Sequence, residues 1–150
     1  MLSQKTKYAL RALVYLASLP TTTLGPGSAS IAEVAVGAKA PRKFLEAILL
    51  ELRKAGFVES RRGRFGGYAL AQAPETVNFA AVIRTVEGPL ALAPCASVTA
   101  YRQCEDCFDV EVCPIRAALI ASRDAVAAVL EGWTLKSSLT SPRLQSLLTD

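Results

Sequence analysis

The residues best suited to chemistry are four cysteines, which lie close together in a 150-residue chain that has no histidine. Eight residues separate the first from the second, two the second from the third, and five the third from the fourth (Cys95, Cys104, Cys107 and Cys113). Clustered thiols of this kind indicate metal binding or redox chemistry. Without histidine the chain lacks the commonest general base and the commonest metal ligand. We expect a cysteine-based site and no enzymatic activity.

Three kinds of chemistry remain open for these cysteines. An iron–sulfur cluster, of the 2Fe–2S or 4Fe–4S type, accepts three or four cysteines from a loop. A structural zinc site typically uses two C-x-x-C pairs or adds histidine, so zinc fits the spacing only in part. A thiol–disulfide switch also fits, because C-x-x-C pairs oxidise readily. We favour the cluster, with all four cysteines as candidate ligands.

The cysteines lie in a segment without periodicity, residues 89–113, between two regions with clear helical patterns. A segment of more than about 15 residues without such a pattern is usually functional in a compact protein, and we treat residues 89–113 as a sensor loop. Residues 1–88 then form a head and residues 114–135 a long helix. The serine-rich residues 136–150 are expected to form a flexible tail.

The head has the pattern of a helix-turn-helix. Residues 30–33, Ser-Ile-Ala-Glu, form a capping box before a short helix that ends near Gly37. Proline suits the first position of the next helix, expected over residues 41–55. Further helices are expected over residues 2–19 and 79–87. The buried stripe expected for the second helix of the motif consists of Phe44, Leu45, Ile48, Leu49 and Leu52.

A basic β-hairpin follows the helix-turn-helix. Residues 57–62 alternate as a strand, residues 68–70 form its partner, and the glycine-rich residues 63–67 make the tip. A hairpin in this place is a wing, whose arginines can reach phosphates or the minor groove. The fold class is therefore mainly α with a small β-hairpin, a winged helix-turn-helix head followed by a long C-terminal helix.

Positive charge is concentrated in the head. Residues 1–64 carry eleven Lys and Arg against four Asp and Glu, a net charge of +7, while residues 65–150 carry six against nine, a net charge of −3. A basic half indicates a polyanion partner or a solvated basic surface. The helix-turn-helix and the wing, in that order, favour double-stranded DNA. The expected DNA-binding residues are Lys5, Lys39, Arg42, Lys43, Glu46, Arg61, Arg62, Arg64 and Gly66.

The long helix carries a pattern typical of a helix that pairs with another. Its apolar positions follow a spacing of four and three residues in alternation, the a/d seam of a coiled coil. The alternative is an amphipathic helix that packs on its own head. We favour a homodimer, because the head is complete without this helix. The expected dimerisation residues are Ile115, Leu119, Val126, Val129 and Trp133.

The composition is that of a globular protein, with 51% hydrophobic and 20% charged residues. No apolar run approaches the roughly 18–20 residues that span a bilayer. We expect a cytoplasmic protein without a membrane partner.

The motifs together resemble the Rrf-type bacterial winged-helix regulators, a family that includes the iron–sulfur cluster assembly regulator, the nitric-oxide-sensing repressor and the rhizobial iron regulator. The resemblance covers about residues 1–135. The segments that carry it lie in the first helix, the second helix of the motif, the turn after it and the wing, and are residues 2–10, 44–46, 52–58 and 62–68. It implies a homodimer whose heads each bind half of a palindromic operator, with Glu46 reading bases and Arg62 entering the minor groove.

In that family three cysteines bind the cluster. By resemblance Cys107 and Cys113 match the last two and Cys95 the first. Cys104 is then an extra cysteine, which is a spare, a fourth ligand or a replacement for one of the others. Some members of the family have no cluster.

Family members often complete the cluster with a non-cysteine ligand, a histidine soon after the last cysteine or a residue of the first helix. Arg116 stands in the first of these places, and Lys7 and Arg11 stand in the second. Charged arginine and lysine do not bind iron. The resemblance therefore implies an all-cysteine site or an open iron position.

The function expected is that of a DNA-binding repressor that senses iron, redox state or nitric oxide through a cysteine-bound cluster. One alternative is a cluster-free winged-helix repressor controlled by a thiol–disulfide switch or by a partner. A remote alternative is a small redox protein, which leaves the helix-turn-helix and the wing unexplained.

Overall fold

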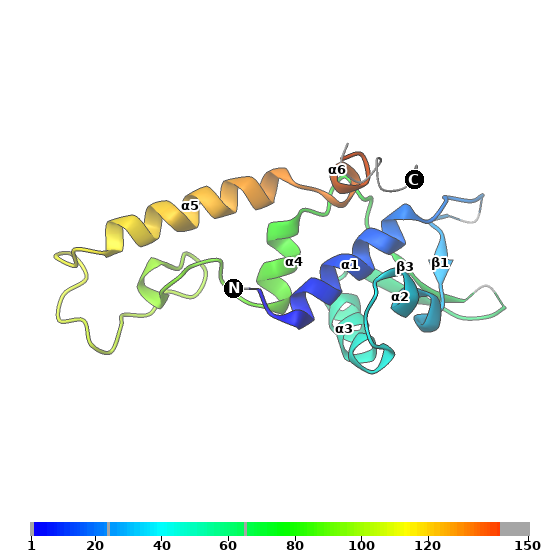
Figure 1. Ribbon diagram of the computed structural model, residues 1–150, viewed down its shortest axis with the longest axis horizontal. Coiled ribbons are helices and arrows are strands. Elements are labelled where there is room, and N and C mark those ends of the chain that lie inside the picture. The colour runs from blue at the N-terminus through cyan, green and yellow to red at the C-terminus, as the bar shows by residue number, and fades with distance from the viewer. Residues whose placement is uncertain (1, 24, 65, 142–150) are drawn as a thin grey trace.

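The computed structural model describes residues 2–23, 25–64 and 66–141 (Figure 1). These residues form a mainly helical protein with a small antiparallel sheet, which confirms the expected fold class. No helix in the described ranges is long and apolar enough to cross a membrane. The elements in chain order are α1 (Gln4–Ser18), β1 (Ser28–Ala29), α2 (Ile31–Gly37), α3 (Arg42–Lys54), β2 (Val58–Arg61), β3 (Gly67–Leu70), α4 (Phe79–Val86), the 3-10 helix η1 (Pro94–Ala96), α5 (Arg116–Gly132) and α6 (Leu135–Leu139).

The helix-turn-helix consists of α2, a turn and α3, as expected from the sequence. The capping box is present: the Ser30 hydroxyl accepts a hydrogen bond from the Glu33 amide, and the Glu33 carboxylate accepts one from the Ser30 amide. This capping hydroxyl holds the pKa of Glu33 below its usual value. Helix α3 packs on α1 and α2 through a buried stripe that consists of Leu45, Ile48, Leu49 and Leu52.

The sheet has one more strand than the sequence predicts. Its order is β1-β3-β2, and both pairs are antiparallel. Strand β1 pairs Ser28 with Ala69 and Ala29 with Tyr68. It has only two residues, within a stretch that reads as a loop, and a strand this short leaves no alternation to detect. It ties the loop before α2 to the base of the wing, which is the hairpin of β2, β3 and their connection.

The first helix is anchored to α4 by a carboxylate. Glu87, which follows α4, accepts hydrogen bonds from the Ser3 amide at 3.1 Å and the Ser3 hydroxyl at 2.6 Å, and a further one from the Thr6 hydroxyl. These bonds, the one from the Ser3 hydroxyl first, lower the pKa of Glu87 to about 2. They fix the end of the head where the cysteine loop (residues 89–113) begins.

Helix α5 extends away from the head, and the cysteine loop lies at its far end (Figure 1). The helix contacts α4 and η1, and within the described chain none of its residues is fully buried. The helix expected over residues 114–135 is two residues shorter at its start and three at its end. Long exposed helices of this kind are uncommon unless another surface covers them.

The expectation of a flexible tail from residue 136 is wrong for its first part. Residues 135–139 form α6, which packs on α1, and Leu135 is completely buried. The backbone around Thr134 also contacts the head, since the Phe79 amide donates to the Trp133 carbonyl at 2.9 Å. The chain therefore returns to the head after α5. Residues 142–150 lie outside the described residues.

Candidate DNA interface and cysteine cavity

The turn of the helix-turn-helix is held in place from α1. Lys39 has a positive φ of 48° and is exposed within this turn. The Arg11 guanidinium lies 3.5 Å from the carbonyl oxygens of both Ala38 and Lys39, to which it donates hydrogen bonds. It also lies over the Tyr8 ring, 5.5 Å from the centroid. Arg11 therefore stabilises the turn that sets the angle of α3.

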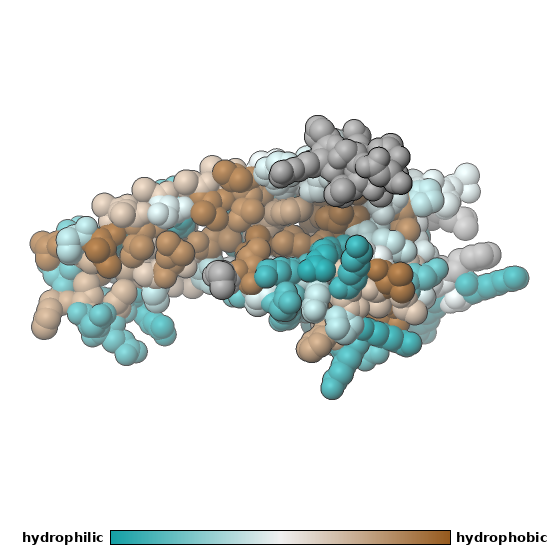
Figure 2. Space-filling view, viewed as in Figure 1, coloured by the Kyte–Doolittle hydropathy of each residue, from teal (hydrophilic) through white to brown (hydrophobic). Residues whose placement is uncertain are grey.

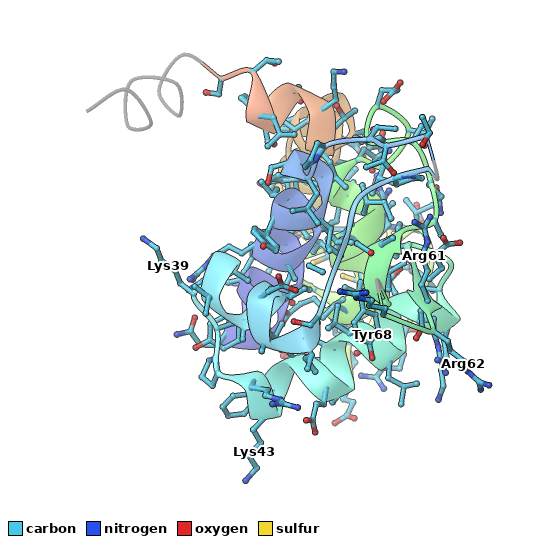
Figure 3. The ribbon with its side chains drawn as sticks, turned by 90° about the vertical axis from the view of Figure 1, so that its right-hand side faces the viewer. Lys39, Lys43, Arg61, Arg62 and Tyr68 are labelled. Atoms are coloured by element: carbon cyan, nitrogen blue, oxygen red, sulfur yellow. The ribbon has the colours of Figure 1, made fainter. Side chains whose placement is uncertain are left out.

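Helix α3 presents charged side chains at its first turns. Arg42, Lys43 and Glu46 are all exposed, and Arg42 Nε lies 3.8 Å from Glu46 Oε1. This separation is a weak surface ion pair, so Glu46 remains available as a hydrogen-bond acceptor. The turn residue Lys39 and Lys43 both point away from the head (Figure 3).

The expectation that Phe44 is buried is wrong. Its side chain is 57% exposed, because it lies on the flank of α3, beside the stripe that faces the core. Its ring contacts Tyr8 of α1, with the ring centroids 6.3 Å apart. A large apolar side chain is therefore held outward near the start of α3.

Lys5 has a partner within the chain. Its Nζ lies 2.6 Å from Glu51 Oε2, and its side chain is 46% exposed. The pair joins α1 to α3, so Lys5 contributes to the packing of the head as well as to its positive surface.

The wing carries three arginines with different surroundings. Arg61 pairs with Glu59 at 2.8 Å and donates to the Pro26 carbonyl at 2.8 Å, which ties the wing to the loop after α1. Arg62 points away from the head on the side of the wing (Figure 3). Arg64 is exposed near the tip. All three line a cavity of about 860 Å³ beside the wing, together with Gly66.

Gly66 is required by the shape of the wing. Its amide donates to the Gly63 carbonyl at 2.9 Å, and a Cβ at position 66 would lie 2.5 Å from the Arg61 carbonyl oxygen. No larger residue fits without a shift of the backbone. The glycine therefore closes the tip of the wing.

The four cysteines converge on one cavity. Cys95, Cys104, Cys107 and Cys113 all line a space of about 340 Å³ at the start of α5. All four are free thiols. Cys95 is buried in η1, and the Cys107 amide donates to the Cys104 carbonyl at 3.2 Å, which forms the turn of the C-x-x-C pair. The loop therefore brings together side chains that are up to 18 positions apart in the sequence.

The thiols influence one another. A hydrogen bond with the Cys104 thiol, followed by partial burial, raises the pKa of the Cys95 thiol. Partial burial, followed by the proximity of Cys113, raises the pKa of the Cys107 thiol. The four thiols are therefore neighbours in the cavity that they line.

The residues of this cavity fit an iron–sulfur cluster by their chemistry. Thiols are its usual ligands, and Asp106 and Asp109 line the same cavity. Among the residues that the structure describes, no three His, Cys, Asp or Glu side chains are already close enough to hold a single metal ion. Thiolates bind both iron–sulfur clusters and zinc, so the lining of this cavity fits either group by its chemistry.

Two arginines of α5 donate hydrogen bonds to backbone carbonyls of η1, the short helix that contains the buried cysteine. Arg116 Nε donates to the Cys95 carbonyl at 3.3 Å, and Arg123 donates to the Ala96 carbonyl. These bonds fix η1 to the first three turns of α5. Sequence analysis missed Arg123, because nothing in the pattern of α5 indicates a hydrogen bond to a loop 27 positions away.

The seam residues of α5 fall on an exposed face. Ile115, Val126, Val129 and Trp133 are between 44% and 62% exposed, and Leu119 is partly buried beside the cysteine cavity. Figure 2 shows brown, apolar atoms along this arm of the molecule. A neighbouring face, with Arg123 and Glu131, packs on η1 and α4.

Helix-turn-helix, wing and protruding long helix define this chain as a winged-helix DNA-binding regulator. The chain belongs to the Rrf2 family, whose model, described as an iron-dependent transcriptional regulator, matches residues 2–140. The proteins of this family are transcriptional regulators and not enzymes.

Two relatives with similar sequences are transcriptional regulators that align with this chain over nearly their whole length. An Rrf2-like HTH-type transcriptional regulator of Rhodobacter capsulatus is 41% identical over 141 residues, which cover 94% of this chain and 93% of that protein. The HTH-type transcriptional regulator NsrR of Halalkalibacterium halodurans is 36% identical over 148 residues, which cover 98% and 96%.

Solved structures show the same fold. The global cysteine regulator CymR of B. subtilis superposes with a TM-score of 0.72 at 29% identity, covering 93% of this chain and 96% of that one. IscR of T. potens superposes with a TM-score of 0.66 at 25% identity, covering 93% and 86%.

Proposed function

We propose that this protein is a cytoplasmic, homodimeric transcriptional repressor that binds a palindromic operator and senses iron, redox state or nitric oxide through a cysteine-bound iron–sulfur cluster. The observation that carries the proposal is the convergence of four thiols on one cavity at the start of α5. The same helix bears the exposed apolar seam and is bonded to the cysteine loop.

The two heads of the dimer would each place α3 in the major groove. Glu46 would accept a hydrogen bond from a cytosine amino group, and Lys43 would contact phosphate. Arg62 would enter the minor groove at the wing, and Lys39, Arg42 and Arg64 would add positive charge. Lys5, which is paired with Glu51, would add positive charge to the interface at longer range.

The cluster would be held by Cys95, Cys107 and Cys113, with Cys104 close enough to Cys95 to act as a fourth ligand. When bound, it would supply a centre that reacts with oxidants or nitric oxide. The loop residues then transmit its state: η1 carries Cys95 and is fixed to α5 by Arg116 and Arg123. A change at Cys95 would move α5 and with it the spacing of the two heads, and half-sites about one helical turn apart tolerate little misfit.

Chemical analysis of protein purified without oxygen tests this proposal. We expect iron and acid-labile sulfide in near-equal amounts, a brown visible spectrum, and loss of both in a variant with all four cysteines replaced by serine. The matched control is the Ser97→Ala variant, which alters the loop and keeps the cysteines. Colourless protein that holds zinc would contradict the cluster, as would a four-serine variant with the parent's affinity for its operator and the parent's response to oxidant.

A thiol–disulfide switch is the second candidate. Four free thiols line one cavity, in which Cys95 would pair with Cys104 and Cys107 with Cys113. In colourless, metal-free protein, hydrogen peroxide would oxidise each pair to a disulfide and be reduced to water. Mass spectrometry of peptides from oxidised protein would identify which pairs form.

A further inference from the structure

The outer face of α3 carries an apolar stripe. Phe44 is 57% exposed and Leu50 42% exposed, and Ala47 between them is also exposed. Residues three apart lie on the same side of a helix, so these three side chains form one continuous row. Ala47 and Leu50 face away from the buried stripe that includes Leu45 and Ile48, and Phe44 lies on the flank of that stripe.

The first residue of this row is held rigidly. The Phe44 ring packs against Tyr8 at a centroid distance of 6.3 Å, and Arg11 covers the Tyr8 ring at 5.5 Å. This stack fixes Phe44 relative to α1 and to the turn that Arg11 also binds. An aromatic side chain that is both exposed and fixed is well placed to contact a partner.

The charge around the row indicates which partner covers it. Lys43 and Lys54 of α3 are exposed, and Arg62 of the wing also points away from the head (Figure 3). A protein partner would need an acidic rim to match these cations, whereas duplex DNA supplies phosphates on both sides of its major groove. The floor of that groove has one apolar group, the C5 methyl of thymine, which alanine and phenylalanine side chains contact.

We propose that Phe44, Ala47 and Leu50 recognise thymine methyl groups in the operator half-site. This inference rests on the DNA-binding function and adds a second mode of base recognition to the hydrogen bonds of Glu46. The stripe contributes specificity because cytosine has no methyl group in that position. The half-site therefore contains at least one thymine opposite the start of α3.

The test begins with operators selected from a random duplex library by the full-length protein. Each thymine of a half-site is then replaced by deoxyuridine, which lacks only the methyl group, and affinity is measured by fluorescence anisotropy. At one or more positions we expect about four-fold weaker binding per half-site, the effect of one methyl group removed from an apolar contact. Phe44→Ala should reduce the preference for thymine at the position that Phe44 contacts, while Phe44→Leu should retain more of it.

Leu92→Ala serves as the control, since Leu92 is 74% exposed and lies outside the head; it should keep the full preference for thymine. Circular dichroism checks that each variant folds. Equal affinity of the parent for thymine and deoxyuridine at every position would overturn the inference. It would also be overturned if Phe44→Ala lost affinity for the thymine and the deoxyuridine operators by the same factor. A library from which no sequence is enriched would refute the proposed function itself, and methyl recognition with it.

Discussion

At the scale of single residues, the cysteines were the most informative part of the sequence, because their type limits their chemistry. Their convergence on one cavity was expected from the spacing. The surroundings that give Arg123 and Glu87 their roles could not be predicted, since both bond to segments far away in the chain. Phe44 was misassigned for a related reason: at a helix flank, periodicity does not decide between core and surface.

Glu87 gives the first prediction, on the dependence of stability on pH. Its pKa is about 2 in the folded state, against an ordinary value of 4.5, chiefly because the Ser3 hydroxyl donates to it. A carboxyl group with a lowered folded-state pKa stabilises the fold fully above its unfolded pKa, and the contribution is lost as pH falls toward the folded value. Glu87→Gln should therefore lower the urea midpoint at pH 7, and its difference from the parent should shrink below pH 4.5.

Urea unfolding at pH 7, 5 and 3.5, followed by circular dichroism, measures this difference. Glu75→Gln is the matched control, because Glu75 is exposed and none of the hydrogen bonds described for Glu87 involves it. A difference between parent and Glu87→Gln that stays constant over this pH range would show that the carboxylate charge has no role in anchoring α1.

At the scale of elements, the long helical patterns were predicted well, and the short elements were not. Helices α1 to α5 fall within a few residues of their expected bounds, because each has its own cap or apolar stripe. Strand β1 and helix α6 were missed. Two residues of β1 and five of α6 are too few for a periodic signal, and both form because the head offers them a partner.

Helix α6 gives the second prediction. Leu135 is completely buried where α6 packs on α1, although it follows the helix expected to leave the head. Leu135→Ala should lower the free energy of unfolding by about 2–5 kcal/mol, the usual cost of this truncation in a core. Leu139→Ala, in the same helix but only half-buried, should lower the free energy of unfolding by clearly less. Equal small losses in both variants, measured by urea unfolding, would place residues 135–139 outside the cooperative fold.

The wing gives the third prediction. Arg62 points away from the head, and we expect it to neutralise one phosphate at the edge of the minor groove for each protomer. The logarithm of the affinity falls linearly with the logarithm of the salt concentration, by about 0.9 for each phosphate neutralised. Arg62→Gln should therefore reduce the steepness of this line by about two units for a dimer. Arg102→Gln, at an exposed position of the cysteine loop, should leave it unchanged.

Fluorescence anisotropy with operator DNA from 50 to 300 mM salt, about the range in which such slopes are usually read, provides the measurement. An unchanged slope in Arg62→Gln would exclude a phosphate contact, even if the affinity fell.

At the scale of the whole molecule, the order of the parts connects the cysteine loop to the helix-turn-helix and the wing. The head holds the DNA-binding elements, α5 carries the cysteine cavity at its start, and α6 returns the chain to the head. The cysteine loop is therefore bounded on one side by the Glu87 anchor and on the other by α5. A rearrangement of this loop would therefore act on the head in two ways, through the Glu87 anchor and through α5.

The exposed seam of α5 gives the last prediction. Val126 and Val129 are 45% and 60% exposed and belong to this seam. If a second copy covers them, replacing both with lysine places charge in an apolar interface, and the protein should become monomeric. Binding to a palindrome should then fall by about 100-fold or more, because the second half-site no longer adds avidity. Binding to an isolated half-site should stay the same. Ala117→Lys, on another face of α5, should remain dimeric.

Sedimentation equilibrium reports the mass of each variant, and anisotropy on palindromic and single half-site duplexes reports the two affinities. A double variant that stays dimeric would place the interface elsewhere. A parent protein that is itself monomeric, with equal affinity for one half-site and for two, would leave the seam as a surface that some other protein covers. The cysteine loop would then act on a single head, through the Glu87 anchor alone.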